Sequence, residues 1–568
     1  MATAVQAAAV VERIWLKSYP PGIPADIPLD GLASLRTVLE RSAERFAELP
    51  AFTCMGRTIS YAQLDGMSRD FASWLQNAAG LAKGARVALM MPNLLQYPVA
   101  LFGALRAGLV VVNCNPLYTP RELEHQLNDS GAEAIVILEN FARTLQEVAP
   151  RTRLRRIVTT QVGDLLGFPK SLLVNAAVKH VKRLVPRWSL PGAVPFNAAL
   201  AEGARHALTE PPLAAEDLAF LQYTGGTTGV SKGAMLTHGN IVANLEQVAA
   251  WICQGLDEGR ETVITALPLY HIFALTGSCL LNLRIGAHNV LITNPRDMPG
   301  FVKELARHPF STMAGVNTLF NALLHTPGFA ELDFSHLKVA LGGGMAVQRA
   351  VAERWKAVTG KPLLEAYGLT ETSPGACINP LVEGADYNGT AGLPLPSTVV
   401  TIRDDAGRIL PTGEVGEICI AGPQVMKGYW NRPDETAKVM TEDGAFRTGD
   451  IGLLTPEGYV KIVDRKKDMI LVSGFNVYPN EIEDVVAMLP GVREVCAVAA
   501  PDERSGETVR VVIVRKDPTL TKEQVIEHCR RQLTGYKVPH IVEFWNELPK
   551  SNVGKVLRRE VKAVAPRP

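Results

Sequence analysis

Alternation between strand-like and helix-like segments is the feature that most limits the fold of this chain. Apolar runs typical of buried strands occupy 86–91, 109–113 and 134–138. Helical apolar spacing fills 96–108, and a second helix starts at Thr119, with a capping box and a proline in its first turn and a glycine at its end. This βαβαβ order predicts a parallel sheet wrapped by helices.

The same alternation resumes in the second half of the chain and then stops. Its strand and helix candidates occupy, in turn, 288–293, 296–307, 311–315, 337–341 and 347–359. From about residue 390 to 463, short strands and turns predict a small β-barrel-like subdomain. Beyond 467 a smaller α+β unit of roughly 100 residues is expected, which is an ordinary domain size. At 568 residues the chain is too long for a single hydrophobic core.

A loop rich in glycine and threonine carries the first indication of chemistry. It runs Tyr223-Thr-Gly-Gly-Thr-Thr-Gly-Val-Ser-Lys-Gly-Ala234, after a short apolar strand at 218–221, and Thr237 can cap the helix that follows. Glycines permit turns that direct N–H groups inward, hydroxyls add donors and Lys232 adds positive charge. These groups suit a polyphosphate, although the spacing of a Walker A loop is absent. A solvated surface loop is the plainer alternative.

Bulk composition excludes several classes of function. Lys+Arg of 58 against Asp+Glu of 57 leaves a net charge of +1, so nucleic acid is not an expected partner. The eight cysteines are dispersed without a C-x-x-C pair, which is typical of a reducing compartment and argues against a zinc site. Because no run of about 20 apolar residues is uninterrupted, no transmembrane helix is predicted. The N-terminus lacks the basic region of a secretion signal, so we expect a cytoplasmic protein.

Residues 165–190 form an apolar, helix-like stretch that contains basic but no acidic residues. The basic positions are Lys170, Lys179, Lys182, Arg183 and Arg187. Such a stretch is typical of a helix that lies on a membrane surface. A solvated helix packed on its own domain is an equally good interpretation. Peripheral contact with the inner face of a membrane is therefore a hypothesis at this point.

Several further segments place polar side chains at strand ends or turns. They are Leu267-Pro-Leu-Tyr-His-Ile-Phe273, Gly342-Gly-Gly-Met345, Glu365-Ala-Tyr-Gly-Leu-Thr-Glu371, Arg447-Thr-Gly-Asp450, Asp464-Arg-Lys-Lys467 and Pro549-Lys-Ser-Asn-Val-Gly-Lys555. With the loop at 223–234, and in this order, they resemble the signature segments of the acyl-adenylating enzyme superfamily over nearly the whole chain. The stretch from Asp464 to Glu481 is similar, more specifically, to bacterial long-chain fatty acid–CoA ligases, as are 94–101 and 533–539.

The resemblance implies a two-step ligase that uses ATP, Mg²⁺ and coenzyme A. A fatty carboxylate attacks the α-phosphorus of ATP to give an acyl-adenylate and pyrophosphate, and the thiol of coenzyme A then displaces AMP. Three catalytic residues are implied: Lys555 bridging the acyl carboxylate and the α-phosphate, Glu371 holding Mg²⁺, and His271 at the acyl and metal site. A histidine at a strand end is also often only hydrogen-bonded structure.

The resemblance also implies the residues that bind the nucleotide. Tyr367 would stack on adenine, and the carboxylate of Asp450 would accept hydrogen bonds from both ribose hydroxyls, although it could equally cap a turn. The full implied set is Tyr223, Thr224, Gly225, Gly226, Thr227, Thr228, Gly229, Lys232, Gly343, Gly344, Met345, Tyr367, Gly368, Thr370, Asp450 and Arg465.

Members of this superfamily rotate a mobile C-terminal domain between the two steps. The corresponding division here is an N-terminal domain at 1–463, a hinge at 464–467 centred on Lys467, and a C-terminal domain at 468–568. Rotation would bring Ser473, Gly474 and Phe475 to the active site. Gly474 would line a narrow pantetheine channel, where any Cβ would be an obstruction.

The acyl specificity is less constrained by the sequence. A long chain needs a deep apolar pocket, for which 271–277 and 314–320 are candidates. Some long-chain synthetases gate their acyl tunnel with a tryptophan just after the histidine motif, whereas this chain has Leu275. A ligase for medium-chain or aryl acids, a fatty acyl-AMP ligase and a non-catalytic acyl-binding protein therefore remain alternatives. The oligomeric state is open, a homodimer included.

Overall fold

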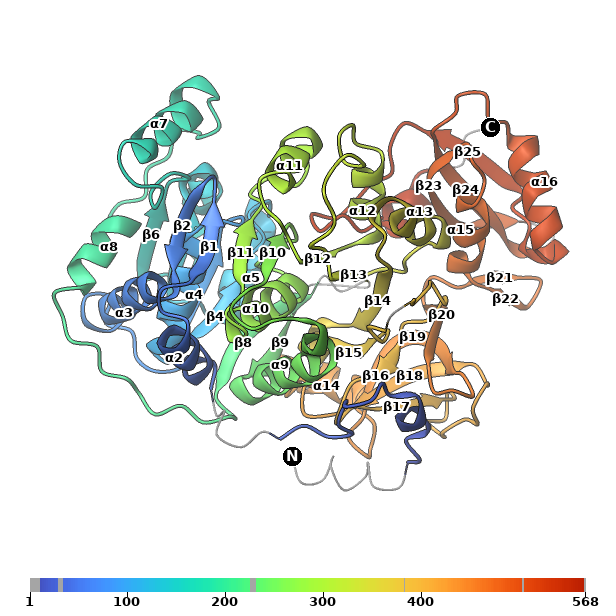
Figure 1. Ribbon diagram of the computed structural model, residues 1–568, viewed down its shortest axis with the longest axis horizontal. Coiled ribbons are helices and arrows are strands. Elements are labelled where there is room, and N and C mark those ends of the chain that lie inside the picture. The colour runs from blue at the N-terminus through green and yellow to red at the C-terminus, as the bar shows by residue number, and fades with distance from the viewer. Residues whose placement is uncertain (1–10, 29–33, 225–230, 383, 503–504, 566–568) are drawn as a thin grey trace.

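A mostly parallel sheet forms one half of the N-terminal body of this computed structural model, which describes residues 11–28, 34–224, 231–382, 384–502 and 505–565 (Figure 1). Its strands are β3 (Arg86–Met90), β4 (Val110–Asn113), β5 (Ala134–Leu138), β6 (Arg156–Thr160), β7 (Val194–Pro195), β8 (Leu218–Thr224) and β9 (Lys232–Thr237). They are ordered β7-β6-β5-β3-β4-β8-β9, and β9 alone among them pairs antiparallel. The predicted βαβαβ unit is confirmed within this sheet.

A second mixed sheet forms the other half of the N-terminal body. Its strands are β1 (Pro50–Cys54), β2 (Arg57–Ser60), β10 (Thr262–Thr265), β11 (His288–Leu291), β12 (Thr312–Gly315), β13 (Val339–Gly343), β14 (Leu363–Gly368), β15 (Gly375–Ile378) and β16 (Leu393–Pro394). The order β16-β15-β14-β13-β12-β10-β11-β1-β2 places parallel strands in the middle and antiparallel strands at both edges. The carboxyl ends of β13 and β14 therefore lie side by side, with the glycine turn and the Tyr367 segment at one edge.

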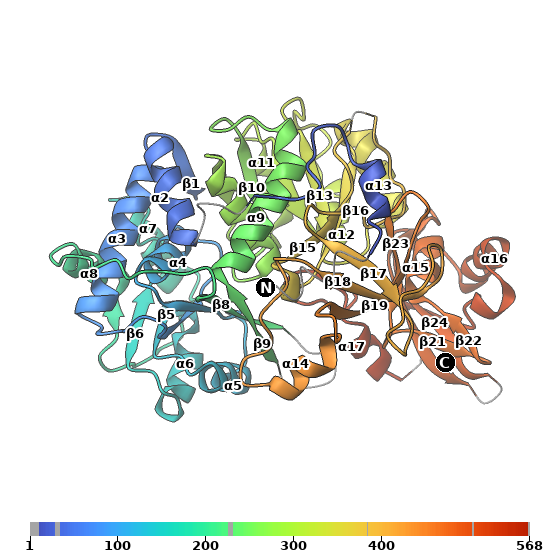
Figure 2. The same ribbon diagram turned by 90° about the horizontal axis from the view of Figure 1, so that it is seen from below.

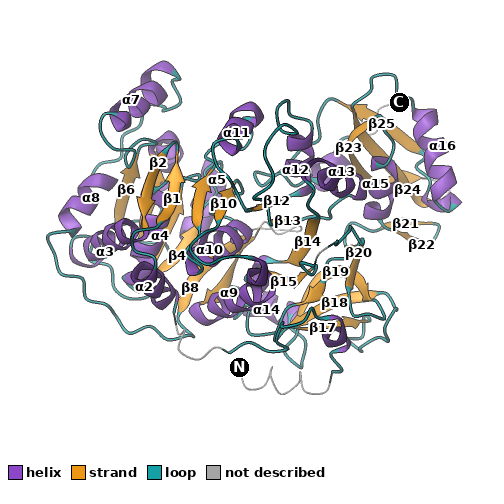
Figure 3. Cartoon of the chain, in the orientation of Figure 1, coloured by secondary structure: helices purple, strands orange, loops and turns teal. Residues whose placement is uncertain are grey.

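Helices cover both sheets, as Figure 3 shows in purple. They are α2 (Leu35–Arg45), α3 (Tyr61–Asn77), α4 (Gln96–Arg106), α5 (Pro120–Ser130), α6 (Ala142–Val148), α8 (Phe196–Gly203), α9 (His238–Ile252), α10 (Leu281–Arg284), α11 (Met298–Leu305), α12 (Asn317–Leu324) and α13 (Arg349–Thr359). Local signals set their ends: Thr119 and Glu122 form a capping box on α5, and Gly131 ends it at a φ of 63°. Alternate strand residues face opposite sides, so Val87 and Leu89 join one core while Ala88 and Met90 join another.

The β-rich subdomain is an antiparallel sheet below the second large sheet. It contains β17 (Val399–Arg403), β18 (Gly416–Ala421), β19 (Phe446–Leu454) and β20 (Val460–Arg465), with α14 (Pro433–Val439) between β18 and β19. The register of β19 and β20 places Asp450 directly opposite Arg465. Two residues that are distant from the glycine loop in sequence are thereby fixed as a pair.

The C-terminal unit is a separate α+β sheet that lies beside the N-terminal body (Figures 1 and 2). It contains β21 (Ile470–Val472), β22 (Phe475–Val477), β23 (Val492–Asp502), β24 (Gly506–Arg515) and β25 (Ile541–Trp545), with α15 (Pro479–Ala487), α16 (Lys522–Gln532) and α17 (Arg558–Ala563). Val509, Val511 and Ile513 face one core, and Val512 and Val514 the other, so both faces of the sheet are covered.

The basic stretch forms a short helix that projects from the body, at the opposite end from the C-terminal unit (Figures 1 and 2). It comprises α7 (Lys170–Ala176) and a π-helical turn at Ala177–Val181. One face of this helix packs on the body, because Val174 contacts the main core and Asn175 accepts a hydrogen bond from the Gly163 N–H. The other face is open to solvent, and Phe168, Leu173 and Val181 are 85%, 67% and 79% exposed. In the described part of the chain, no helix is long and apolar enough to cross a membrane.

Candidate active site

The glycine-rich loop connects the two antiparallel strands β8 and β9. The sequence predicted the first strand and the helix that Thr237 caps, but not β9 between them. In the register of this hairpin Tyr223 lies opposite Gly233 and Thr224 opposite Lys232. Gly225, Gly226, Thr227, Thr228 and Gly229 lie outside the described residues. The two strand ends nevertheless fix where the loop begins and where its lysine emerges.

Lys232 is held by two residues that sequence reasoning did not single out. Its ammonium forms an ion pair with Glu435 of α14 and lies 5.3 Å from the centroid of the Tyr429 ring. Hydrogen bonding from Lys232 is the largest cause that lowers the pKa of Glu435 to about 2. No local signal marks Glu435 or Tyr429, because each lies about 200 residues further along the chain. Without an anionic ligand, Glu435 therefore neutralises the lysine of the loop.

Glu371 is a buried carboxylate in the short 3-10 helix that follows β14. Its side chain accepts a hydrogen bond from the Tyr429 hydroxyl at 2.7 Å, and its carbonyl accepts one from the Met426 N–H at 2.8 Å. Burial raises the pKa of Glu371, and the Tyr429 bond opposes that rise. A carboxylate has about four acceptor positions, so one tyrosine donor leaves capacity for a hard cation such as Mg²⁺.

The residues that surround Glu371 do not form a complete metal cage. Within the described part of the chain, no group of three or more His, Cys, Asp and Glu side chains could hold a metal ion. Mg²⁺ typically keeps several waters and is bound through one or two carboxylates together with substrate phosphates. A lone buried carboxylate fits that kind of site and does not fit a structural metal centre.

Lys555 reaches the N-terminal body from the C-terminal unit. A methyl group added to Gly344 would stand 3.2 Å from Cε and 3.7 Å from Nζ of this lysine. Burial lowers the pKa of Lys555 to about 8; the charge of Arg465 lowers it further, while Asp450 and Glu371 raise it. The predicted catalytic lysine and the predicted Glu371, Asp450 and Arg465 are therefore brought together.

Asp450 and Tyr367 form a polar pair beside the lysine. The Tyr367 hydroxyl donates to Asp450 Oδ2 at 2.7 Å, and Arg465 Nε lies 3.3 Å from Asp450 Oδ1. Desolvation raises the pKa of Tyr367 well above its usual value, and the Asp450 charge raises it further. The predictions that Tyr367 stacks on adenine and that Asp450 binds ribose stay predictions. The two side chains bond to each other, and the charge of Asp450 acts on Lys555.

The glycine turn and the segment after β14 line the same place through their backbones. A Cβ on Gly343 would meet the Phe273 ring at 3.0 Å, and one on Gly368 would overlap the carbonyl of Pro374. Gly344 has a φ of 76°, which favours glycine. Met345 packs at the edge of the main core, and Thr370 begins the 3-10 helix that carries Glu371. These residues shape the floor of the site rather than add reactive groups.

His271 lies in the turn that leads from β10 into the following helix. Its Nδ1 accepts a hydrogen bond from the Phe273 N–H at 3.3 Å. Burial, and then the charge of Lys555, lower the pKa of His271 to about 3. The imidazole is therefore neutral at pH 7, and it can bind or orient a polar group but cannot supply a positive charge.

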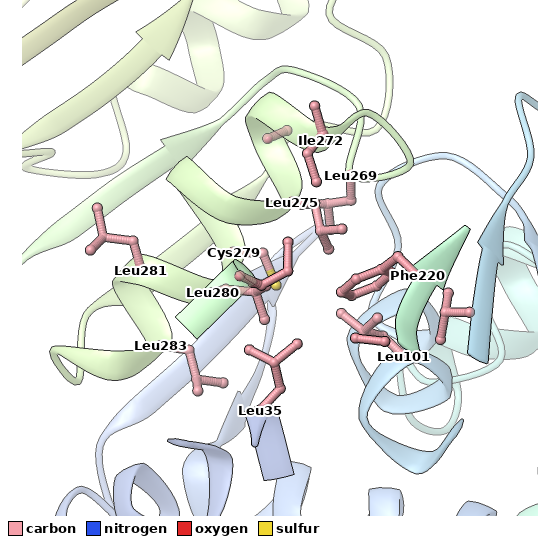
Figure 4. Packing of buried hydrophobic residues seen from close by; sticks show 14 of the residues in the cluster. Leu35, Leu101, Phe220, Leu269, Ile272, Leu275, Cys279, Leu280, Leu281 and Leu283 are labelled. Atoms are coloured by element: carbon pink, nitrogen blue, oxygen red, sulfur yellow. The ribbon is translucent and has the colours of Figure 1, made fainter. Parts of the chain in front are cut away.

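The helix that follows His271 packs in the hydrophobic core of the N-terminal body. Leu275 is fully buried in the cluster shown in Figure 4, with Phe220 and Leu101 from the first sheet and its helix. The side chain that stands where some long-chain enzymes have a gating tryptophan thus packs inside the protein.

The residues predicted for the coenzyme A step lie elsewhere. Ser473, Gly474 and Phe475 form the tip of the β21–β22 hairpin, at the outer edge of the C-terminal sheet (Figure 1). A Cβ on Gly474, whose φ is 83°, would meet nothing within 4 Å. Phe475 is 55% exposed and stacks on Tyr536 with ring centroids 4.8 Å apart. Lys467, the predicted hinge, is an exposed residue of the turn between β20 and β21, and partial desolvation of its ammonium lowers its pKa.

This fold and site define a nucleotide-binding α/β enzyme with a separate, small C-terminal unit beside the body. The chain belongs to the AMP-binding enzyme family, whose sequence pattern matches residues 39–430, while the pattern of the AMP-binding enzyme C-terminal domain matches 481–555. It is 58% identical to a long-chain-fatty-acid–CoA ligase of Escherichia coli O6:H1 over 97% of this chain and 98% of the relative. The corresponding ligase of Haemophilus influenzae is 51% identical over 98% of this chain and all of the relative. The anthranilate CoA ligase AuaEII, solved with anthranoyl-AMP, shares the fold at a TM-score of 0.83, with 23% identity over 94% of this chain and 98% of that one.

Proposed function

We propose that this chain is a long-chain fatty acid–CoA ligase, an acid–thiol ligase that consumes ATP and forms an acyl-adenylate. One observation carries the proposal: the half-buried Lys555 lies against Gly344, and its ammonium interacts with the charges of Glu371 and Asp450. Full-length relatives at 51–58% identity support the acyl class. The competing ligases for medium-chain or aryl acids would use the same site, so only the acyl preference separates them.

The first half-reaction joins two anions and needs positive charge at the reacting atoms. An oxygen of the fatty carboxylate attacks the α-phosphorus of ATP, and the bond from that phosphorus to pyrophosphate breaks. The Lys555 ammonium offsets the charge that develops there, and Lys232 with the glycine-rich loop receives the outer phosphates. Glu371 would hold Mg²⁺, which would supply further charge neutralisation at the phosphate oxygens. Asp450 and Tyr367 orient the nucleoside.

The second half-reaction requires a thiol to reach the acyl carbon. The sulfur of coenzyme A attacks the acyl carbonyl carbon, and AMP departs with the electrons of the broken carbon–oxygen bond. Lys555 occupies that region in the described arrangement, and Gly474 is remote from it. We therefore propose that the C-terminal unit turns about Lys467, which withdraws Lys555 and delivers the β21–β22 hairpin.

Release of AMP that depends on coenzyme A tests this function directly. Saturated acids of increasing length, benzoate and a hydroxycinnamate would be compared at equal concentration. The proposal expects the highest kcat/KM with long-chain acids and no AMP release after chelation of Mg²⁺. A preference for aryl or medium-chain acids would contradict the acyl assignment, and formation of acyl-AMP without thioester would indicate an acyl-AMP ligase.

The projecting helix supports a second proposal, peripheral binding of a cytoplasmic enzyme to an anionic membrane. Exposed Phe168 lies just before α7, and exposed Leu172, Leu173 and Val181 lie on α7 and the turn that follows it, in a stretch that also carries basic side chains. Apolar side chains can enter the acyl boundary while the cations meet anionic headgroups. Such binding would place the enzyme where long-chain acids partition.

Sedimentation with vesicles of phosphatidylglycerol and phosphatidylcholine tests this docking. Leu172→Ser combined with Leu173→Ser should weaken vesicle binding roughly tenfold, because it removes most of two exposed leucine side chains. The matched control is Leu117→Ser, since Leu117 is also exposed but lies outside this helix. Equal binding by the control and the double variant would contradict the proposal.

A further inference from the structure

An ion-pair network joins the tail of the chain to the end of β20. Arg558 follows Lys555 closely in the sequence, and its guanidinium contacts four side chains, one of them Asp468, whose Oδ2 lies 3.6 Å from Nη1. Its Nη2 lies 2.8 Å from Glu483 Oε2 and 2.6 Å from Asn480 Oδ1, and its Nη1 lies 3.3 Å from Asp464 Oδ1. Burial opposes but does not outweigh these carboxylates, so the pKa of Arg558 is raised. The guanidinium is thus the centre of the network.

The partners of Arg558 belong to two different parts of the molecule. Asp464 pairs with Ile451 in the antiparallel sheet of β19 and β20, and so belongs to the N-terminal body. Asn480 and Glu483 lie on α15, which packs against β23 of the C-terminal sheet. The Arg558–Glu483 contact is internal to the C-terminal unit, whereas the Arg558–Asp464 contact crosses between the two parts.

Asp464 depends on that crossing contact. Its side chain is fully buried, and its carboxylate accepts hydrogen bonds from the Arg465 N–H at 2.7 Å and the Asn480 N–H at 2.8 Å. Burial raises the pKa of Asp464 to about 6, against the lowering effect of Arg558. A buried carboxylate that loses its cation and one of its donors is strongly destabilised. In the arrangement described here, the Asp464 carboxylate has both its cation and its hydrogen-bond donors.

The segment between Arg558 and Lys555 is short and held by its own backbone hydrogen bonds. The position of Arg558 therefore determines the position of Lys555. The Leu557 N–H donates to the Pro549 carbonyl at 2.8 Å, and the Ser551 N–H donates to the Lys555 carbonyl at 2.7 Å. At the tip, the Thr318 hydroxyl of α12 donates to the Gly554 carbonyl at 2.7 Å. A shift of Arg558 would therefore displace Lys555, and misplacement by about 1 Å is enough to cost about a hundredfold in rate.

We propose that the contact between Asp464 and Arg558 is a latch that exists in only one arrangement of the two parts and positions Lys555 for adenylation. The inference rests on the proposed function and adds two positioning residues to it. Neither residue touches substrate. When the C-terminal unit turns about Lys467, Arg558 keeps Glu483 but leaves Asp464, so the latch opens as Lys555 withdraws.

Separate assays of the two half-reactions test the latch. Asp464→Asn preserves the shape and one of the two acceptor oxygens but removes the charge that attracts Arg558. We expect exchange of pyrophosphate into ATP, with a long-chain acid, to fall about tenfold, as for contacting charged residues. Thioester formation from supplied acyl-adenylate should stay within about twofold of wild type. Glu483→Gln is the matched control, since it changes the same network inside the C-terminal unit and should alter both half-reactions by the same factor.

Arg558→Lys keeps the prediction testable if Asp464→Asn does not fold. Lysine retains the charge but cannot contact α15 and β20 together, so the same selective loss of exchange is expected. If the variant that is measured changes both half-reactions equally, or changes neither, the proposed latch is contradicted. Wild-type enzyme without exchange activity on any acid would instead contradict the proposed function itself.

Discussion

The loop at 549–557, which carries Lys555, and the β21–β22 hairpin at 470–477 belong to the same C-terminal unit. They differ in whether the N-terminal body surrounds them. Lys555 is half-buried beside Gly344, and desolvation lowers its pKa to about 8. Gly474 is surrounded by open space and Phe475 is exposed. One rigid unit that carries both groups cannot present them to one site at once. Under the proposed function, the described arrangement would serve adenylation alone.

Removal of the lysine should produce the largest effect and divide the two half-reactions. Lys555→Ala is expected to slow pyrophosphate exchange about 10²–10³-fold, the usual cost of removing a group that stabilises developing charge. Thioester formation from supplied acyl-adenylate should change less than about threefold. Lys550→Ala is the control, because Lys550 is on the same loop but pairs with Glu494. Equal loss in both half-reactions would contradict the proposal that Lys555 acts in adenylation only.

A bulky residue at the hairpin should give the opposite pattern. Gly474→Leu is expected to slow thioester formation by about tenfold or more, because a side chain would fill the proposed channel, and to leave exchange within about twofold. Strain at a positive φ costs roughly 1–2 kcal/mol by itself. Gly407→Leu controls for that strain, since Gly407 has a φ of 81° and nothing within 4 Å, but lies in the N-terminal body. A loss of pyrophosphate exchange in Gly474→Leu would contradict the proposal that Gly474 lines the coenzyme A channel.

The pH dependence should also separate the two regions. Because the pKa of Lys555 is about 8, its ammonium is present below that pH and lost above it. The kcat/KM for exchange should therefore fall about tenfold per pH unit above pH 8. Thioester formation from acyl-adenylate should lack this limb. Lys555→Arg should abolish the limb, because arginine stays charged. His271, with a pKa of about 3, should contribute no ionisation between pH 5 and 9.

The smallest expected effect concerns the partner of Lys232. Glu435→Gln removes the carboxylate that competes with ATP for this ammonium. The KM for ATP should fall about two- to fivefold, within the range for a partly exposed ion pair, while kcat changes little. Lys438→Gln is the control, since Lys438 contacts the other oxygen of Glu435. A rise in the KM for ATP would show that Glu435 positions Lys232 rather than restrains it.

The sequence predicted what local signals determine. The alternation over 86–138, the capping box at Thr119 and the left-handed Gly131 are all confirmed because each depends on nearby residues. The strand β9 was missed because the residues from Lys232 to Thr237 continue directly from the glycine-rich loop, without a turn signal of their own. The family resemblance placed Lys555 with Glu371 and Asp450, which spacing alone could not do.

The partners of the site residues were beyond prediction for a physical reason. Tyr429 donates to Glu371, and Glu435 pairs with Lys232. Both contacts form only because the segment between β18 and β19 packs against the β8–β9 hairpin. The exposure of Leu172 and Leu173 likewise depends on how the projecting helix leaves the body. Such contacts are decided by tertiary packing, which no short pattern encodes.

Reversible locking of the two parts tests the central claim most directly. The Asn321 side chain of α12 donates to the Arg493 carbonyl of the C-terminal unit at 2.8 Å, so Asn321→Cys with Arg493→Cys can cross-link this arrangement. The described native cysteines are buried and should not interfere. The account predicts that the oxidised variant retains pyrophosphate exchange and loses acyl-CoA formation, and that reduction restores it. Acyl-CoA formation at the wild-type rate by the fully cross-linked enzyme would contradict the account.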